Sequence, residues 1–372
     1  MAQLGRMGRM GRMGRMGRMG RMGRMGGDST DHAGGPSDVQ LHAGLMTTRE
    51  GTVGYWQGNA TNRELADAFE KSGDGDILYA QADVRARILD YALFSRFTVE
   101  EDTSRATPAA RVAIDTTKRI AEIYRPSNDQ FEAQLSYLRS YADLRPDRID
   151  EIDLQIDDIT SFFGSLGYLD PQRRARTLDL LSAVERLAVF IEMRVKHILH
   201  APRPIDYAVE VQPMIQTPDH SSFPSGHACE SFAVATMLYF LMFDNHPHSL
   251  IDGVNNHHRI FRVAERMTVN RTVAGVHFPC DSAAGALLGC QIANAVFLLA
   301  KSHRYPEGDG PSFTMLDVGD DSSDAQMSAG EDFNLEWLAR ALKDHGAGET
   351  DGTDDRVLEK AWQLARKEWA GR

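Results

Sequence analysis

The sequence predicts an all-α fold, a helical bundle that follows a long N-terminal tail. Apolar residues recur at a spacing near 3.6 through most of the chain after residue 63. Helix start signals precede several of these segments, and strands do not alternate with helices anywhere. We therefore divide the chain into a disordered tail and linker (1–62), an all-helical domain (63–305), a second linker (306–330) and C-terminal helices that pack on the domain (331–372).

The tail opens with a repeat. Residues 5–25 are seven copies of Gly-Arg-Met, and a glycine at every third position prevents a stable helix. A cationic tract of this kind could bind RNA or an acidic membrane, but no aromatic residues lie between the arginines. A disordered tail is the better interpretation. Residues 26–62 continue as a linker rich in Gly, Ser, Asp and Thr, with one packing candidate at Tyr55-Trp56.

The elements after the tail are all interpreted as helices. They are expected at 78–95, 108–124, 127–143, 147–164, 171–200, 226–243, 257–272, 282–301, 333–344 and 354–370. Ser127 and Gln130 form a capping box. Asp170 and Pro171 supply an N-cap and a first-turn proline for the longest helix. The aspartates between 150 and 158 could hold a cation, but a solvated helix face is the better interpretation.

Composition narrows the classes of function. The net charge is −12, although seven arginines and no acid lie in the first 27 residues, so the rest of the chain is more acidic still. A general nucleic-acid binder is therefore excluded. Cys229, Cys280 and Cys290 form no CxxC pair and are expected to be reduced, with Cys229 and Cys280 interpreted as packing residues.

No membrane span is expected. The apolar run 232–243 is too short, and the run 283–300 is interrupted by Gln291 and Asn294 and opened by two glycines. Both runs are interpreted as buried core helices. Because no secretion signal is visible either, we expect a cytoplasmic protein.

Three short segments carry the chemistry. They are Lys196 followed by Arg203-Pro204; Pro224-Ser225-Gly226-His227; and Arg271 with His277 and Asp281. Arginine donates two parallel hydrogen bonds to an oxyanion, and lysine adds a compact charge. Each segment stands at an expected helix end. The inventory suits a site that surrounds a compact tetrahedral oxyanion and does acid–base work on it.

The second and third segments supply the remaining groups. Ser225 adds a hydroxyl at a helix start, where unpaired backbone N–H groups favour anions, and Gly226 lets the backbone approach closely. His227 can give or take a proton. Asp281 stands where an N-cap would stand and can fix the tautomer of His277, which leaves the other ring nitrogen free to attack or to ligate.

The three segments resemble the signature of the type 2 phosphatidic acid phosphatase/vanadium haloperoxidase superfamily. One departure is Asn270, which stands where the family usually has serine. The resemblance implies an all-helical bundle of the vanadium haloperoxidase/acid phosphatase type. It also implies that the phosphate or vanadate oxygens are held by Lys196, Arg203, Arg271, Ser225 and the Gly226 amide.

The roles of the histidines depend on the chemistry. In a phosphatase, His277 would attack phosphorus and His227 would protonate the leaving group. In a haloperoxidase, His277 would be the single protein ligand of vanadium in the vanadate cofactor, and His227 would handle protons. Vanadate copies the phosphoryl transition state, so one site can serve both chemistries.

The sequence favours a bromide-type haloperoxidase that oxidises halide with hydrogen peroxide. His220 lies five residues before Ser225, where algal bromoperoxidases similarly have an additional histidine. A soluble phosphatase acting on phosphate monoesters, with no cofactor, is the alternative, and a non-catalytic oxyanion-binding protein is the third possibility. The expected partners of the protein are small molecules, either peroxide and halide or a phosphate ester. A homo-oligomer is also considered.

Overall fold

The protein is described here by a computed structural model. It covers residues 39–71, 77, 80–103, 107–116, 118–243, 248–301, 310–315, 325–342 and 356–370. The prediction for the Gly-Arg-Met repeat lies outside these residues.

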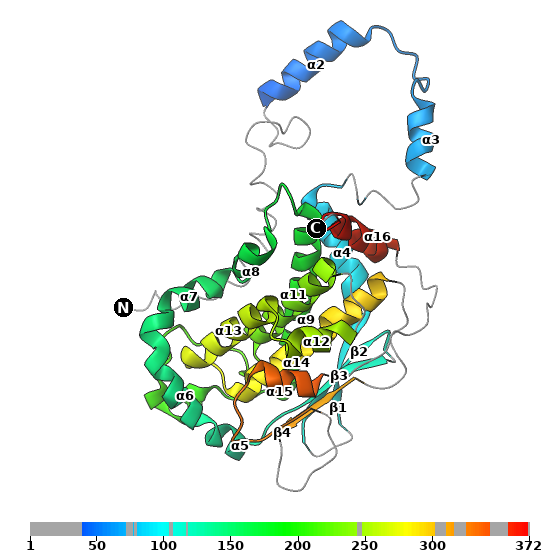
Figure 1. Cartoon of the computed structure of the whole chain (residues 1–372). Coiled ribbons are helices and arrows are strands. Elements are labelled where there is room, and N and C mark those ends of the chain that lie inside the picture. Colours follow the sequence, from blue (N-terminus) through cyan, green and yellow to red (C-terminus); the bar gives the residue numbers. More distant parts are fainter. Residues whose placement is uncertain are drawn as a thin grey trace.

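The described chain is mostly helical (Figure 1). Its α-helices are α2 (Val39–Val53), α3 (Arg63–Lys71), α4 (Ala82–Phe94), α5 (Asn128–Ala133), α6 (Leu135–Tyr141), α7 (Arg145–Asp157), α8 (Thr160–Gly167), α9 (Ala175–Leu199), α10 (Pro204–Tyr207), α11 (Gly226–Phe243), α12 (His248–Asn255), α13 (Arg259–Val273), α14 (Pro279–Ala300), α15 (Leu335–Ala341) and α16 (Arg356–Lys367). Most expected helices are present within a few residues. The all-α prediction was nevertheless wrong, because a five-stranded sheet accompanies the helices.

The sheet accounts for one expected helix that does not exist. Residues 108–124 form the antiparallel strands β2 (Ala109–Ile114) and β3 (Lys118–Tyr124), and β1 (Phe97–Asp102) pairs with β2. Asp115 and Thr116, with φ of 50° and 62°, make the turn between β2 and β3. Nearly every residue of β2 and β3 is apolar or buried, so no period of two marks them as strands.

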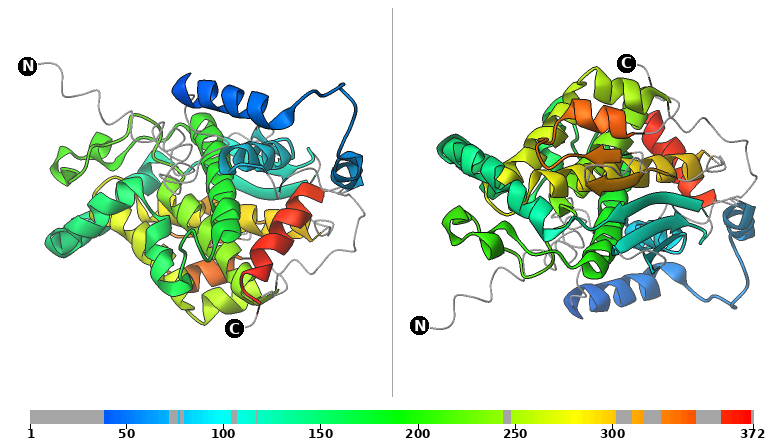
Figure 2. Two further views of the ribbon diagram at one scale, coloured as in Figure 1. Left: turned by 90° about the horizontal axis from the view of Figure 1, so that it is seen from above. Right: turned by 90° about the horizontal axis from the view of Figure 1, so that it is seen from below.

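The expected linker at 306–330 also contains strands. β4 (Ser312–Met315) pairs in parallel with β3, and β5 (Ala325–Met327) pairs in parallel with β4. The linker prediction was wrong for these segments because Gly, Asp and Ser around them hide two short buried strands. The sheet packs against α9 and α14 on one side of the helices (Figure 2).

The core is built around α11 and α14, which pack on each other and on α9. A Cβ on Gly285 would lie 2.4 Å from Ser225 O, and one on Gly289 would lie 2.2 Å from Cys229 O. The two glycines therefore let the backbones of α11 and α14 touch. By length and composition both helices could cross a membrane, but their most apolar windows are 89 % and 100 % buried inside the protein, as expected of core helices.

The segments outside this core differ in their packing. The expected linker before residue 63 contains the helix α2, so the prediction of an irregular segment was wrong there. Its described side chains are exposed, and α2 and α3 stand apart from the body in Figure 1. At the other terminus α15 and α16 pack on the body, and Trp362 of α16 meets Phe297 of α14 with ring centroids 5.1 Å apart.

Two capping predictions have different outcomes. The capping box of Ser127 and Gln130 is confirmed, with both reciprocal hydrogen bonds present at the start of α5. Asp170, in contrast, does not cap the longest helix, which begins at Ala175. Its carboxylate accepts from the backbone N–H groups of Gln172 and Arg173, so it closes a turn before the helix.

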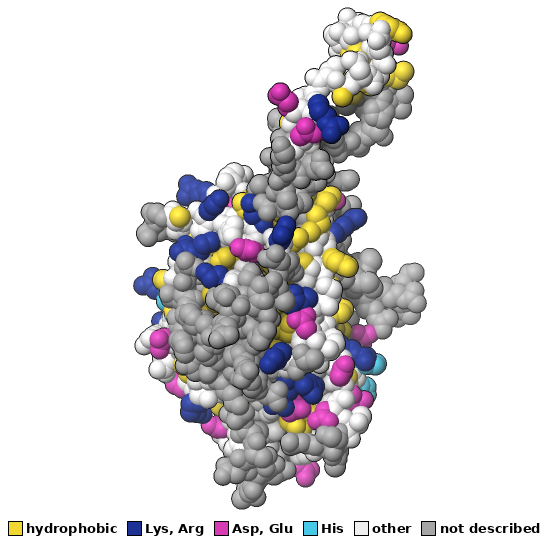
Figure 3. Space-filling model, turned by 90° about the vertical axis from the view of Figure 1, so that its right-hand side faces the viewer, with side chains coloured by type: hydrophobic (Ala, Val, Ile, Leu, Met, Phe, Trp, Pro, Cys, Tyr) yellow, Lys and Arg dark blue, Asp and Glu magenta, His cyan; other side chains and the backbone are white. Residues whose placement is uncertain are grey.

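The surface carries charges of both signs. On the face shown in Figure 3, Lys and Arg side chains lie among Asp and Glu side chains over the described residues. Asp153 and Asp157 on α7 are exposed. The interpretation of the acidic run as a solvated helix face is therefore the one that agrees with the structure.

Candidate active site

His277 lies in the turn between α13 and α14, and Asp281 holds it from the first turn of α14. His277 Nδ1 and Asp281 Oδ2 are 2.9 Å apart. Asp281 Oδ2 also accepts from the Phe278 backbone N–H at 3.1 Å and from the Ser222 hydroxyl. The predicted N-cap role of Asp281 was wrong in detail: α14 begins at Pro279, so Asp281 closes a capping box from inside the helix.

This contact fixes which ring nitrogen of His277 is reactive. A carboxylate only accepts hydrogen bonds, so Nδ1 carries the proton and Nε2 keeps its lone pair. Burial, followed by the charges of Arg203 and Lys196, holds the pKa of His277 well below its usual range. Burial raises the pKa of Asp281 to about 6, against the hydrogen bonds from Ser222 and Phe278. A neutral imidazole with a directed lone pair results.

Arg203 faces that lone pair. Its Nη1 lies 3.2 Å from His277 Nε2 and donates to the Val276 carbonyl at 2.9 Å. Its Nε and Nη2 donate to the His220 carbonyl at 3.2 and 3.1 Å, and Nη2 lies 3.2 Å from His220 Nδ1. The structure therefore brings the predicted residues Arg203, His220 and His277 together.

Lys196 reaches the same backbone segment from the last turns of α9. Its Nζ donates to the carbonyls of Ser221 at 3.3 Å, Ser222 at 3.1 Å and Pro224. Arg203 Nη2 also donates to the Ser221 carbonyl, at 3.2 Å. Lys196 and Arg203, seven residues apart in the sequence, thus converge on one oxygen. Both side chains are buried.

His227 and Arg271 meet at a residue that the sequence did not single out, Gln155 of α7. His227 Nε2 donates to the Gln155 carbonyl at 3.0 Å. Arg271 Nη2 donates to Gln155 Oε1 at 3.3 Å and to the Ile152 carbonyl at 3.1 Å. The charges of His227 and His220 both lower the pKa of His277, which places these imidazoles within electrostatic reach of it.

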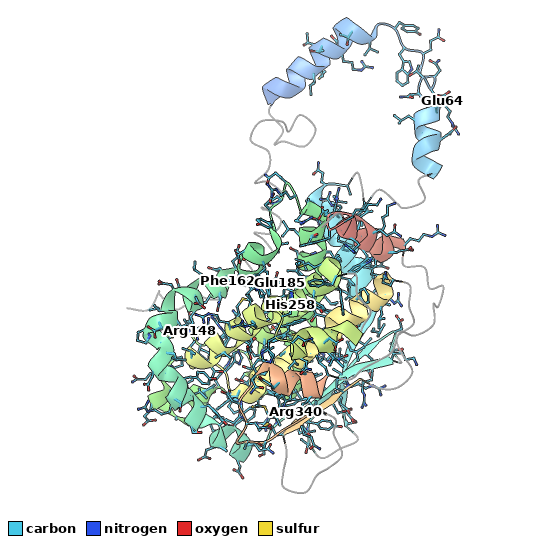
Figure 4. All side chains as sticks on the ribbon, in the orientation of Figure 1. Glu64, Arg148, Phe162, Glu185, His258 and Arg340 are labelled. Atoms are coloured by element: carbon cyan, nitrogen blue, oxygen red, sulfur yellow. The ribbon has the colours of Figure 1, made fainter. Side chains whose placement is uncertain are left out.

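Asn270 joins α13 to α7 beside Arg271. Its amide nitrogen donates to Gln155 Oε1 at 3.0 Å and to Glu151 Oε2 at 3.1 Å, and its oxygen accepts from Arg148 at 2.8 Å. Figure 4 labels Arg148 on α7. An asparagine has the donors and the acceptor for all these bonds, whereas a serine hydroxyl has a single proton to give. Asn270, the residue that departs from the family pattern, therefore has its own hydrogen-bond partners on α7.

Ser225 and Gly226 lie at the start of α11, as predicted. The Ser225 N–H donates to the Asp281 carbonyl at 2.8 Å, and its hydroxyl accepts from the Ala228 N–H at 3.5 Å. Ser225 therefore caps α11 and ties it to α14. Gly226 packs against a second unpredicted residue, because a Cβ there would lie 2.6 Å from Glu192 Oε2.

Three buried polar residues were missed by sequence reasoning: Gln155, Glu192 and Ser222. Glu192 could have been found, because it lies one turn before Lys196 on the apolar stripe of α9. Ser222 lies three residues before Ser225, inside the loop that precedes the second segment. Gln155 has no comparable signal, since its importance depends on α7 folding back over α11 and α13.

Cys229 and Cys280, also near the site, are buried and free. Burial raises the pKa of both thiols well above their usual value. A thiol reacts as its thiolate. The interpretation of these cysteines as packing residues therefore agrees with the structure.

The family model of the PAP2 superfamily matches residues 178–305 of the chain. This stretch contains all the predicted site residues. Among solved structures, a transmembrane PAP2-type phosphatidylglycerolphosphate phosphatase from Bacillus subtilis is similar at 19 % identity and a TM-score of 0.35, over 47 % of this chain and 88 % of that one. No curated protein matches the chain.

Proposed function

We propose that this protein is a phosphatase that hydrolyses small phosphate monoesters through a phosphohistidine at His277. One observation carries the proposal: the lone pair of a neutral, buried imidazole lies 3.2 Å from an arginine donor, with a carboxylate behind its other nitrogen. An activated nucleophile beside a cation is the arrangement that attack on an anionic phosphate requires.

The reaction would proceed in two steps. His277 Nε2 attacks phosphorus, the bond to the ester oxygen breaks, and His227 gives that oxygen a proton. Water then attacks the phosphohistidine, His227 takes a proton from the water, and inorganic phosphate leaves with His277 neutral again. Asp281 keeps the Nδ1 proton in place and stabilises the charge that the imidazole acquires.

The phosphate oxygens would be held by Lys196, Arg203 and Arg271, with the Ser225 hydroxyl and the Gly226 amide. Two supports are geometric. Lys196 and Arg203 share an acceptor at Ser221, which fixes their charges close together. Arg271 and His227 share Gln155, which links the third cation to the proton donor.

A substrate that arrives from water fits the packing of the core helices. α14 is surrounded by the rest of the protein along its most apolar stretch. A lipid would have to displace core contacts to touch that stretch. The proposed substrate class is therefore a small phosphate ester, and a cytoplasmic location remains a prediction from the sequence.

A haloperoxidase is the second candidate, favoured by the position of His220. Its imidazole lies 3.2 Å from the guanidinium of Arg203, at the edge of the same cage. His277 Nε2 and the three cations form a donor set that would fit vanadate, which would supply peroxide activation when bound. We rank the phosphatase first because the lone pair of His277 beside the Arg203 guanidinium suits direct attack on phosphorus.

One assay pair separates the candidates. The purified protein is given p-nitrophenyl phosphate, and separately bromide with hydrogen peroxide, each with and without added vanadate. A phosphatase hydrolyses the ester and is inhibited by vanadate. Bromide oxidation that depends on vanadate would instead identify a haloperoxidase, and neither activity in a protein that binds phosphate would identify an oxyanion-binding protein.

A further inference from the structure

Glu192 is a fully buried carboxylate that lies outside the three sequence segments. It is 0 % exposed and stands on α9 one turn before Lys196, with Oε2 3.7 Å from Lys196 Nζ. A carboxylate is rarely buried to this extent unless a cation or a helix N-terminus compensates its charge. Glu192 lies beside both.

The helix N-terminus is that of α11. A Cβ on Gly226 would lie 2.6 Å from Oε2 and 2.7 Å from Oε1 of Glu192. The carboxylate therefore rests against the first residue of α11, where the helix dipole favours negative charge. The carboxylate of Glu192 therefore occupies part of the space that Gly226 leaves open.

Lys196 needs this charge because of its other contacts. It donates to three backbone carbonyls, those of Ser221, Ser222 and Pro224, and an ammonium has three donors. Carbonyls carry only partial charges, so they do not neutralise a buried cation. The charges of Lys196 and Arg203 both act on His277 and Asp281, and the charges of Lys196, Glu192 and Glu230 act on Cys229.

These neighbours differ in how far they can compensate the charge of Lys196. Arg203 is a cation, and His277 is held neutral. Asp281 is engaged by His277, Ser222 and Phe278. Glu230 lies one turn further along α11 than Gly226. Glu192 lies at ion-pair distance from Lys196.

We propose that Glu192 is a positioning residue that keeps Lys196 charged and directed at residues 221–224, and thereby sets the affinity of the site for oxyanions. The inference rests on the proposed function, because it takes Lys196 to be part of the oxyanion cage. It adds a residue that acts through Lys196 and that no segment of the signature contains.

The test is phosphate binding by Glu192→Gln, which keeps the shape and removes the charge. Binding of inorganic phosphate is measured by titration calorimetry from pH 6 to pH 9 and compared with the unaltered protein at each pH. The ratio of the two dissociation constants should rise from near one at pH 6 to about tenfold at pH 9, because the uncompensated ammonium loses its proton and with it the charge that attracts the anion.

A role in packing alone would give the same ratio at every pH, and that result would overturn the inference. Glu185→Gln is the matched control. Glu185 lies two turns earlier on α9 and faces Thr160 of α8 at 3.4 Å (Figure 4). Its loss removes the same charge from the same helix and should leave the ratio near one throughout.

Two further variants make the result specific. In a Lys196→Gln background, Glu192→Gln should add no pH-dependent effect, and a persistent effect would contradict action through Lys196. If Glu192→Gln does not fold, Glu192→Asp keeps the charge and should keep a flat ratio. Failure of the unaltered protein to bind phosphate at all would overturn the oxyanion site itself, and the inference with it.

Discussion

The two ring nitrogens of His277 have different partners, and this difference defines what the residue can do. Asp281 accepts the proton of Nδ1 at 2.9 Å, while Nε2 faces Arg203 at 3.2 Å. The sequence indicated both partners: Arg203 belongs to the first of the three segments, and Asp281 follows His277 by four residues at an expected helix start. It did not indicate Ser222, whose hydroxyl supports the same carboxylate.

His277→Ala should abolish the covalent intermediate. Without the nucleophile, turnover of a phosphate ester should fall by about 10⁴-fold or more, and rapid-quench labelling with radioactive substrate should trap no phosphoprotein. His258→Ala is the control, because His258 caps the N-terminus of α13, whereas Arg271 lies in the last turn of that helix. Unchanged turnover in His277→Ala would remove His277 from the mechanism.

The raised pKa of Asp281 predicts an acidic limit of activity. Below pH about 6 the carboxylate gains a proton, so it no longer holds the Nδ1 proton of His277 and Nε2 becomes a weaker nucleophile. We expect kcat/KM to fall about tenfold per pH unit there.

The substrate itself ionises near pH 6, so the comparison must be made with Asp281→Asn. That variant should be slower at every pH. It should also lose the part of the fall in kcat/KM at acidic pH that protonation of Asp281 causes. Identical limbs in both proteins would assign the whole effect to the substrate.

At the scale of elements, helices that carry one apolar stripe were predictable and buried strands were not. α9, with its regular stripe, was found within four residues at its start and one at its end. β2 and β3 are buried on both faces, so their apolar residues follow no period. The β-branched residues Val112, Ile114, Ile120 and Ile123 were the signal available for a strand.

The site was predictable to the extent that it lies in one stretch of sequence. The residues from Lys196 to Asp281 stand at the ends of α9, α11, α13 and α14, and capping chemistry marks those ends. Gln155 comes from a helix some 70 residues earlier than His227. No local pattern encodes that contact, because it depends on how α7 folds over the core.

The close packing of α11 and α14 predicts a sharp effect of one methyl group. In Gly289→Ala the new Cβ would lie 2.2 Å from Cys229 O and 3.0 Å from Ala233 N, so the helices must separate. We expect a loss of about 1–3 kcal/mol in the free energy of unfolding and a fall in kcat, since the start of α11 moves.

Gly164→Ala in α8 is the control for Gly289→Ala. Nothing lies within 4 Å of its Cβ position, so the helix should be stabilised by about 0.5–1 kcal/mol. Urea denaturation of both variants makes the comparison. Equal stabilities would mean that α14 does not need glycine at position 289.

At the scale of the whole molecule, the segment that matches the family packs against helices and strands that lie outside it. β4 and β5 lie beyond residue 305 yet complete the sheet, and Trp337 and Trp362 are buried against the body. A chain that ends at residue 305 should therefore lose cooperative thermal unfolding, although it keeps every site residue.

A chain that starts at residue 72 is the matched comparison for that truncation. The described side chains of α2 are exposed and α3 stands apart from the body in Figure 1. The melting temperature of the shortened chain should therefore equal that of the full chain. Circular dichroism melts of the two shortened chains and the full chain decide the matter. Cooperative melting of the chain that ends at 305 would show that the sheet extension is dispensable.

The shared oxygen at Ser221 has a consequence for how this site tolerates change. Lys196 and Arg203 are held there by carbonyl groups, which every amino acid possesses, rather than by side chains. The Ser221 hydroxyl in turn accepts from the Ala201 N–H at 2.8 Å and donates to the Phe223 carbonyl at 3.3 Å, so it helps to hold the loop that presents these carbonyls. Inserting or deleting one residue between 220 and 224 should disable them, because it displaces each acceptor by about 3.8 Å. Natural or laboratory evolution must therefore preserve both the length of this loop and the hydroxyls of Ser221 and Ser222.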